Sequence, residues 1–145
     1  MNKEATLLIV EDDQVDIMGL KRVLNKLRIA NPVKVANDGI EALEILRGKN
    51  GNEKLDTPFI IMLDLNMPRM NGLEFLKELR KDPVHQNAVV FVMTTSSDEQ
   101  DIYQAYQNNI AGYIIKSDAE TTFTQALNLL EHYWKVVELP TNTAG

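Results

Sequence analysis

The chain has 145 residues, of which 44% are hydrophobic and 25% charged, enough for one domain with a substantial core and too few for two ordinary ones. Its 15 Lys and Arg against 21 Asp and Glu give a formal net charge of -6, which opposes broad binding to nucleic acid. There is no cysteine for disulfides, and no apolar run approaches the ~18 residues of a membrane span. We therefore expect a cytoplasmic protein that binds neither membranes nor nucleic acid.

Five short apolar runs alternate with segments of helical periodicity. The runs begin at Leu7, Val33, Phe59, Val89 and Tyr113, and they read LLIV, VKVA, FIIML, VVFVM and YII. Runs that are apolar at nearly every position are typical of strands covered on both faces, and the helical segments between them suit crossover connections. The pattern predicts an α/β fold, with a doubly wound, five-stranded parallel sheet flanked by five helices.

Two serine and glutamate pairs mark the expected starts of the last two helices. Ser96 with Glu99, and Ser117 with Glu120, have the S-x-x-E spacing of a capping box. We therefore expect the fourth and fifth helices to be capped by these serines.

The chain shows no linker that leads to a second domain. In the last predicted helix, apolar residues keep helical spacing from Phe123 to Val137, and Pro140 follows shortly after. A proline cannot continue the helix, and only the short segment TNTAG follows Pro140. We therefore expect this end of the chain to fray. We predict one domain over residues 1–139, a flexible tail over residues 140–145, and no output domain.

Polar side chains follow four of the five predicted strands at the points where the strands end. They are Glu11, Asp12 and Asp13 after the first strand, Asp64 after the third, Thr94 and Thr95 at the end of the fourth, and Lys116 after the fifth. In a doubly wound sheet, ligands bind outside the carboxyl ends of the strands, so we expect these groups to converge on one rim. Carboxylates gathered without a cation repel one another, whereas Mg²⁺ is held by carboxylates, waters and phosphate, so a Mg²⁺ site is predicted.

This combination of groups suits phosphoryl transfer. Mg²⁺ and Lys116 would neutralise phosphate oxygens, and the Thr94 hydroxyl would donate a hydrogen bond to another. Asp64 ends the central apolar strand, and a carboxylate held in line with a phosphodonor can form an acyl phosphate. Taken singly, each residue has a simpler explanation, since Asp12 or Asp13 could cap the first helix and a lone lysine is usually solvated. The combination favours the functional interpretation.

Four segments resemble the response-regulator receiver domains of two-component signalling in their order and spacing. The segments are LLIVEDD, IMLDLNMPRMNG around Asp64, VMTTS and GYIIK, and together they span roughly residues 5–135. The resemblance implies a flavodoxin-like fold, Mg²⁺ as cofactor, and a histidine kinase as the source of the phosphoryl group. It also implies a switch that changes its contacts with a partner or a second copy, rather than a metabolic enzyme.

The resemblance further implies a role for each matching residue near the metal. Asp64 is the expected phosphoacceptor. The expected metal ligands are the carboxylates of Asp12 and Asp64 and the backbone carbonyl of Asn66, with Glu11 reaching the ion through a water.

A second group of residues is expected to sense the phosphoryl group. Thr94 resembles the switch hydroxyl of the family, and Thr95 joins it in the phosphate-binding set. Lys116 resembles the lysine that pairs with phosphate, and Tyr113 the aromatic residue that turns inward when the hydroxyl moves.

The chain departs from the family pattern at two positions. Ser117 follows Lys116 where the family usually has a proline in a cis peptide, so the loop either takes a trans path or its contacts hold strain. Glu11 replaces the commoner aspartate and reaches one methylene further, which favours a water-bridged contact. Asp13 is left without a family role, and Asp16 is expected to be a solvated acid that stabilises the first helix.

An apolar stripe lies beside the core-facing stripe of the last predicted helix. It consists of Leu129, Tyr133 and Val136, to which Tyr103 and Tyr106 of the fourth helix are added. Scattered surface apolarity is common, but contiguous patches more often mark contacts. We predict a homodimer or partner face made by the fourth helix, the fifth strand and the fifth helix.

Several features resemble a narrower group, the single-domain regulators paired with bacterial and cyanobacterial phytochrome-type histidine kinases. These features are the long loop over residues 48–58, Ser117 after the lysine, the TTS at the fourth strand and the tail HYWKVVELP. Members of this group often form dimers. The resemblance implies a phytochrome-type kinase as partner.

Two other functions compete with the switch. An aspartyl-phosphate hydrolase of the haloacid-dehalogenase class needs a second Asp two residues after its nucleophile, but Asn66 stands there and a cap domain is missing. An interaction module that never takes phosphate would not need the acceptor, acids, hydroxyl and lysine together. We therefore expect no enzyme activity beyond phosphorylation from a donor and self-dephosphorylation.

His85 and His132 lack any partner pattern and are expected at the surface.

Overall fold

The computed structural model describes residues 4–141. In this range, strands and helices alternate strictly, as the apolar runs predict. The elements are β1 (Thr6–Val10), α1 (Gln14–Lys26), β2 (Val33–Ala36), α2 (Gly39–Arg47), β3 (Phe59–Leu63), α3 (Gly72–Lys81), β4 (Val89–Thr94), α4 (Glu99–Gln107), β5 (Gly112–Ile115) and α5 (Ala119–Val136). Among the described residues, no helix combines the length and the apolar character that crossing a bilayer requires.

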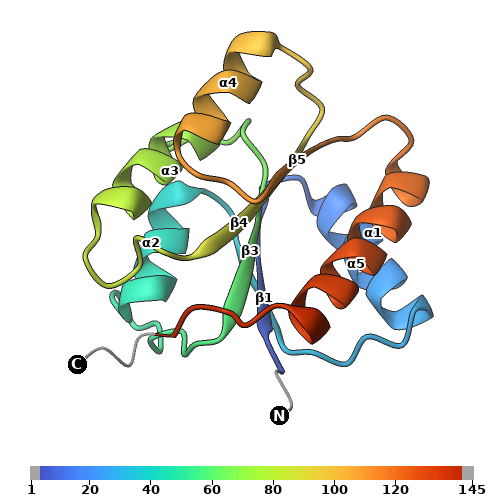
Figure 1. Cartoon of the computed structure of the whole chain (residues 1–145), viewed down its shortest axis with the longest axis horizontal. Helices are drawn as coiled ribbons and strands as arrows, with labels where there is room; N and C mark the ends of the chain where they lie inside the picture. The colour runs from blue at the N-terminus through green and yellow to red at the C-terminus, as the bar shows by residue number, and fades with distance from the viewer. Residues whose placement is uncertain (1–3, 142–145) are drawn as a thin grey trace.

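The five strands form one parallel sheet in the order β2-β1-β3-β4-β5. Figure 1 shows α1 and α5 on one face of this sheet and α2, α3 and α4 on the other. Alternate residues of β3 enter the two cores, Ile61 and Leu63 on the α2–α4 side and Ile60 and Met62 on the α1–α5 side. Because both faces are covered, an uninterrupted apolar run is what the central strand requires. The predicted doubly wound fold is confirmed.

Short polar side chains cap α1, α2, α3 and α4. The predicted serine capping boxes are wrong: Asp98 precedes α4 and its carboxylate accepts the N–H groups of Gln100 and Asp101. Asp118 precedes α5 and makes no side-chain cap bond. Asp caps a helix as well as Ser does, and Ser96 instead uses its hydroxyl to bond an acid inside α4.

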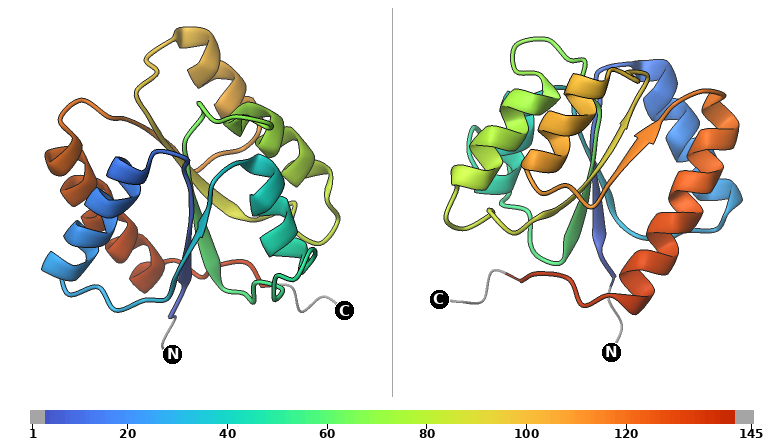
Figure 2. Two further views of the ribbon diagram at one scale, coloured as in Figure 1. Left: turned by 180° about the vertical axis from the view of Figure 1, so that it is seen from behind. Right: turned by 45° about the horizontal axis from the view of Figure 1, so that its top comes forward.

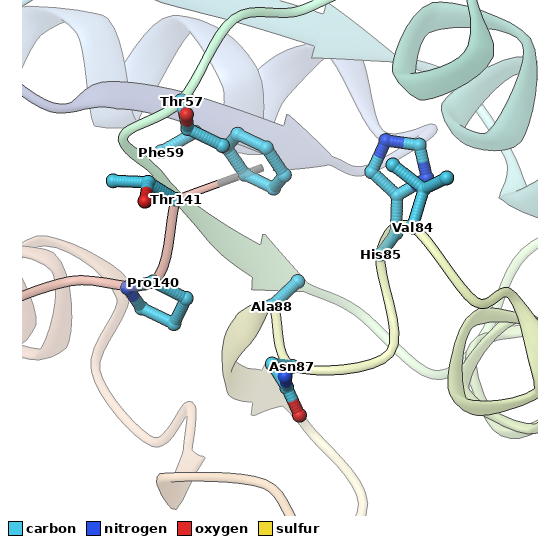
Figure 3. A pocket seen from close by; sticks show the side chains of 8 residues that line it. All are labelled: Thr57, Phe59, Val84, His85, Asn87, Ala88, Pro140 and Thr141. Carbon is cyan, nitrogen blue, oxygen red and sulfur yellow. The ribbon is translucent and has the colours of Figure 1, made fainter. Parts of the chain in front are cut away.

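The residues after α5 run beneath the amino-terminal edge of the sheet in Figure 1. Leu139 is buried there, and Pro140 and Thr141 help to line a small cavity of about 30 Å³ that Figure 3 shows. His85 lines the same cavity and is only 4% exposed, so its predicted surface position is wrong. Its ring packs near Phe59, the first residue of β3. Of the predicted flexible tail, residues 142–145 lie outside the described residues.

The carboxyl ends of the strands share the opposite edge because all five strands are parallel. The chain leaves β1 toward β2 on one side and reaches β3 on the other, so the topology switches direction at β1 and β3. Loops diverge at such a switch point and leave room for a ligand. This edge, where the strands end, lies toward the top of Figure 1.

Candidate functional site

An open hollow of about 340 Å³ lies at the carboxyl ends of β1, β3, β4 and β5. Its lining consists of Glu11, Asp12, Asp13, Asp16, Asp64, Asn66, Thr95 and Lys116. The structure therefore brings the predicted acids, amide, one hydroxyl and lysine together from four segments of the chain. Thr94 is fully buried at the end of β4.

Main-chain hydrogen bonds fix the residues that leave the strands. The N–H of Asp64 donates to the carbonyl of Val10 at 3.0 Å, and the N–H of Lys116 donates to the carbonyl of Thr94 at 2.7 Å. The loop after Asp64 also packs closely, since a Cβ on Gly72 would lie 2.5 Å from the Asp64 carbonyl oxygen. Only glycine fits at that position without moving the backbone of Asp64 and Leu65.

Three carboxylates gather at the centre of the hollow. Oxygen atoms of Glu11, Asp12 and Asp64 lie within 4.8 Å of one another, with Glu11 and Asp64 buried and Asp12 exposed. Burial and the charge of Asp64 raise the pKa of Glu11 to about 7, because the nearby Lys116 does not fully offset them. The cluster of three carboxylates thus carries more negative charge than Lys116 neutralises. Its hard oxygen donors fit a divalent cation such as Mg²⁺.

The neighbouring acid Asp13 has a structural task. Its carboxylate accepts the N–H of Val15 at 2.9 Å and that of Asp16 at 3.4 Å, which caps α1. Of the two acids that could have capped this helix, Asp13 does so. Its own N–H donates to Glu11 Oε2 at 3.2 Å, which holds the Glu11 side chain.

Lys116 lies among the carboxylates with its side chain only 6% exposed. Its ammonium donates to Asp16 Oδ2 at 2.7 Å and to Glu11 Oε1 at 3.0 Å, while Asp64 Oδ2 is 3.9 Å away. Burial alone would lower the pKa of Lys116, but the bond to Asp16 and the charges of Glu11 and Asp64 raise it overall. The peptide bond to Ser117 is trans, since the one cis bond in residues 4–141 is elsewhere.

The prediction that Asp16 is solvated is wrong. The carboxylate is the nearest partner of Lys116, and it is 19% exposed. Side chains in a helix lean toward its N-terminus, so an acid in the first turn of α1 reaches back over the rim. This lean could have indicated from the sequence that Asp16 points toward the rim. It could not have indicated its partner, because Lys116 lies 100 residues further along the chain.

Ser96 links the predicted switch residues. Its N–H lies 3.5 Å from Thr94 Oγ1, and its carbonyl accepts the Tyr113 hydroxyl at 2.9 Å. Its own hydroxyl donates to Asp101 in α4 at 2.7 Å. Tyr113 is half-buried and packs against the α2–α4 core. Thr94, Tyr113 and α4 are thus joined through one residue, a connection that the sequence pattern did not reveal.

An ion pair that sequence reasoning missed connects two loops at the rim. Arg69 Nε donates to Asp38 Oδ2 at 2.6 Å and Nη2 donates to Oδ1 at 3.2 Å. Burial alone would raise the pKa of Asp38, but these bonds and the N–H of Glu41 lower it. The pair ties the loop after the phosphoacceptor candidate Asp64 to the start of α2. Nothing in the spacing of the two residues pointed to it.

The predicted dimer face is partly exposed. Tyr103, Tyr106, Leu129 and Val136 are exposed, whereas the Tyr133 ring is half-buried and meets Phe91 edge-on at 5.2 Å. The edge strand β5 lies between α4 and α5 in the right view of Figure 2.

Comparison with known proteins identifies a family and a group of relatives. Residues 7–128 match the model of the response regulator receiver domain. The response regulator Rcp1 of Synechocystis sp. is 30% identical over 140 residues, which cover 96% of this chain and 95% of Rcp1. The phosphorylated cyanobacterial phytochrome response regulator RcpA superposes with a TM-score of 0.84 at 31% identity, covering 94% of this chain and 99% of RcpA. The Mn²⁺-bound form of Rcp1 superposes with a TM-score of 0.81 at 28% identity, with 94% and 99% of the two chains covered.

Proposed function

Because the chain belongs to the family of response regulator receiver domains, we propose that it is a switch phosphorylated on Asp64 by a histidine kinase. The observation that carries the proposal is the setting of Asp64. It follows the central strand, is buried in the acidic hollow, and has the Lys116 ammonium 3.9 Å from its carboxylate. No other acid in residues 4–141 combines these three features.

The proposed transfer needs little chemistry from the protein. A carboxylate oxygen of Asp64 attacks the phosphorus of a phosphohistidine; the new O–P bond forms as the P–N bond breaks, and the departing imidazole keeps the electron pair and takes up a proton. Lys116 neutralises one phosphoryl oxygen, and the hydroxyls of Thr94 and Thr95 offer donors to others. Positioning and charge stabilisation supply most of the acceleration in such reactions.

Mg²⁺ is the proposed cofactor. Bound at this site, it would neutralise charge that develops on the phosphoryl oxygens. Asp12, Asp64 and the backbone carbonyl of Asn66 are the proposed ligands, with Glu11 acting through a water. The crowded carboxylates and the raised pKa of Glu11 support a divalent cation here, and Rcp1, which is similar, has been observed with Mn²⁺.

The proposed switch runs through Ser96. When the Thr94 hydroxyl moves toward the phosphoryl group, the N–H of Ser96 loses its acceptor. The Ser96 carbonyl then shifts with the loop, and with it the anchor of Tyr113. This changes the surface around α4. A few kcal/mol of difference between two conformations in equilibrium suffices for such a shift.

The proposed partners are a phytochrome-type histidine kinase and a second copy of the chain. Similarity to the phytochrome response regulators supports the first. The exposed side chains of α4 and α5 on either side of the edge strand β5 support a homodimer. We further propose that residues up to 139 act as one domain in the cytoplasm, with buried Leu139 as its last core residue. Sedimentation with and without a phosphate mimic tests the dimer, and a monomer in both states would contradict it.

Incubation with acetyl phosphate and Mg²⁺ tests the function. Intact-mass spectrometry should find one added phosphoryl group in the wild type and none in Asp64→Asn. Asp56→Asn removes an exposed acid by the same chemical change and should behave like the wild type. A wild type that takes no phosphoryl group from any small donor or kinase would contradict the proposal, and turnover of a generic phosphatase substrate would favour the hydrolase instead.

A further inference from the structure

The closest partner of Lys116 is a residue outside the strand ends. Asp16 comes from the first turn of α1, and its Oδ2 lies 2.7 Å from the Lys116 ammonium. Asp64, the group whose phosphate Lys116 would have to reach, is 3.9 Å away and beyond hydrogen-bonding distance. The resting lysine is therefore hydrogen-bonded to the acid of the helix, while Asp64 lies at the outer limit of an ion pair.

The two carboxylates that hold Lys116 leave it little freedom. An ammonium has three N–H donors, and Asp16 and Glu11 engage two of them. The lysine side chain is 6% exposed, and those of Glu11 and Asp16 are 3% and 19% exposed, so water screens these pairs less than at an open surface. Charge-assisted bonds in such a setting are strong. The third N–H can meet a phosphoryl oxygen, but because Asp64 is 3.9 Å away, moving the ammonium toward it would lengthen the bond to Asp16.

The backbone holds the Asp16 side chain in place. The residue lies in the first turn of α1, where its N–H faces the Asp13 carboxylate at 3.4 Å, and α1 packs against α5. A carboxylate on a rigid element keeps its position better than one on a loop. Asp16 is thus a fixed alternative acceptor for a lysine whose long side chain can swing.

We infer that Asp16 is a positioning residue that holds Lys116 away from Asp64 at rest, and that it competes with the phosphoryl group for the lysine. The inference rests on the proposed function, because it takes Asp64 to be the phosphoacceptor. The strength of the ion pair then sets how tightly a phosphoryl group is held. An aspartate at this position weakens phosphoryl binding relative to a neutral residue of the same shape.

Binding of beryllofluoride in the presence of Mg²⁺, followed by ¹⁹F NMR, tests the competition. Asp16→Asn should bind this phosphoryl mimic about three- to tenfold more tightly than the wild type, as expected for loss of one partly buried ion pair. Glu120→Gln removes the same charge from the neighbouring first turn of α5, where Glu120 meets only the exposed Lys26, and should change the affinity little. Unchanged or weaker binding by Asp16→Asn would overturn the inference.

A double-mutant cycle separates action through the lysine from a general effect of charge. In a Lys116→Gln background, Asp16→Asn should no longer tighten binding, because the competing donor is absent. Persistence of the full effect there would show that Asp16 acts only through the field of its charge and would also overturn the inference.

The NMR signal of the Lys116 ammonium gives a readout that needs no phosphate. In the unphosphorylated protein, Asp16→Asn should shift this signal and speed its exchange with water, and Glu120→Gln should not. An unaltered signal would mean that Asp16 does not hold the lysine. Failure of the wild type to bind beryllofluoride at all, with the lysine signal still dependent on Asp16, would instead count against Asp64 as acceptor.

Discussion

Asp82, at the end of α3, and Glu11, at the rim, are both little exposed, and burial by itself raises the pKa of each carboxyl group. At Asp82, the N–H of Val84, the guanidinium of Arg47 and the ring of His85 outweigh burial and lower the pKa to about 2. The carboxylate therefore stabilises the folded chain. Asp82 is charged at neutral pH, and in that state its carboxylate bonds Arg47 of α2 and Val84 and His85 of the α3–β4 connection.

At Glu11, the neighbouring charge works in the opposite direction. The carboxylate of Asp64 adds to the effect of burial, and Lys116 offsets the two only in part, so the pKa is raised to about 7. A metal-free protein therefore holds this carboxylate at a cost to its stability. The charge of Asp82 is thus balanced by its own partners, whereas the carboxylates at the rim keep an excess of negative charge that suits a cation.

The largest expected effect is that of Glu11→Gln on the metal-free protein. A raised pKa means that stability from the protonated group is fully present below about pH 4.5 and is lost as pH rises through about 7. The wild type should thus lose about 3 kcal/mol between these limits relative to the variant. Urea unfolding at pH 5 and pH 8 measures this, and equal pH dependence of the two proteins would refute it.

Asp82→Asn should have a smaller effect of the opposite sign. A lowered pKa means that stability is present above about pH 3.8 and is lost as pH falls through about 2. The variant should be less stable than the wild type by about 2 kcal/mol at pH 7, and the difference should shrink in acid. Chemical unfolding at pH 7 and pH 3 checks the sign, with Asp56→Asn as the exposed control.

The affinity for Mg²⁺ should fall as the pH is lowered through about 7. Protons compete with the cation for Glu11, so binding should weaken about tenfold per pH unit once the carboxyl is protonated. Calorimetry in buffers of different ionisation enthalpy measures the protons released. Glu11→Gln should release fewer protons, and an equal release would place the titrating group elsewhere.

Ser96→Ala should have the smallest effect on stability, about 1 kcal/mol, because it removes two exposed or part-buried bonds, from the hydroxyl to Asp101 and from the N–H of Asp98 to the hydroxyl. The Tyr113 anchor is the Ser96 carbonyl and remains. The start of α4 should therefore become more mobile while the Tyr113 ring keeps its position. Hydrogen exchange of the amides in residues 96–101 would detect the first change, and altered Tyr113 NMR shifts would contradict the second.

The sequence predicted the fold and the rim because both depend on short-range patterns. The apolar run at Phe59–Leu63 needs a strand covered on both faces, and the acid that follows it must then lie at the carboxyl edge. The capping prediction at Ser96 was wrong because Asp98, two residues later, is an equally good cap. Asp16 was misplaced because its partner Lys116 lies 100 residues further along the chain. His85 has a partner nearby in Asp82, but its burial against Phe59 depends on the packed fold.

The central proposal is that Asp64 accepts the phosphoryl group, and direct identification of the modified residue tests it most sharply. Borohydride reduces an aspartyl phosphate to homoserine, which tandem mass spectrometry can locate after treatment with acetyl phosphate and Mg²⁺. Homoserine at position 64, and at no other acid of the rim, is the predicted result. Homoserine at Asp12 or Asp13, or an unchanged peptide around Asp64, would contradict the proposal.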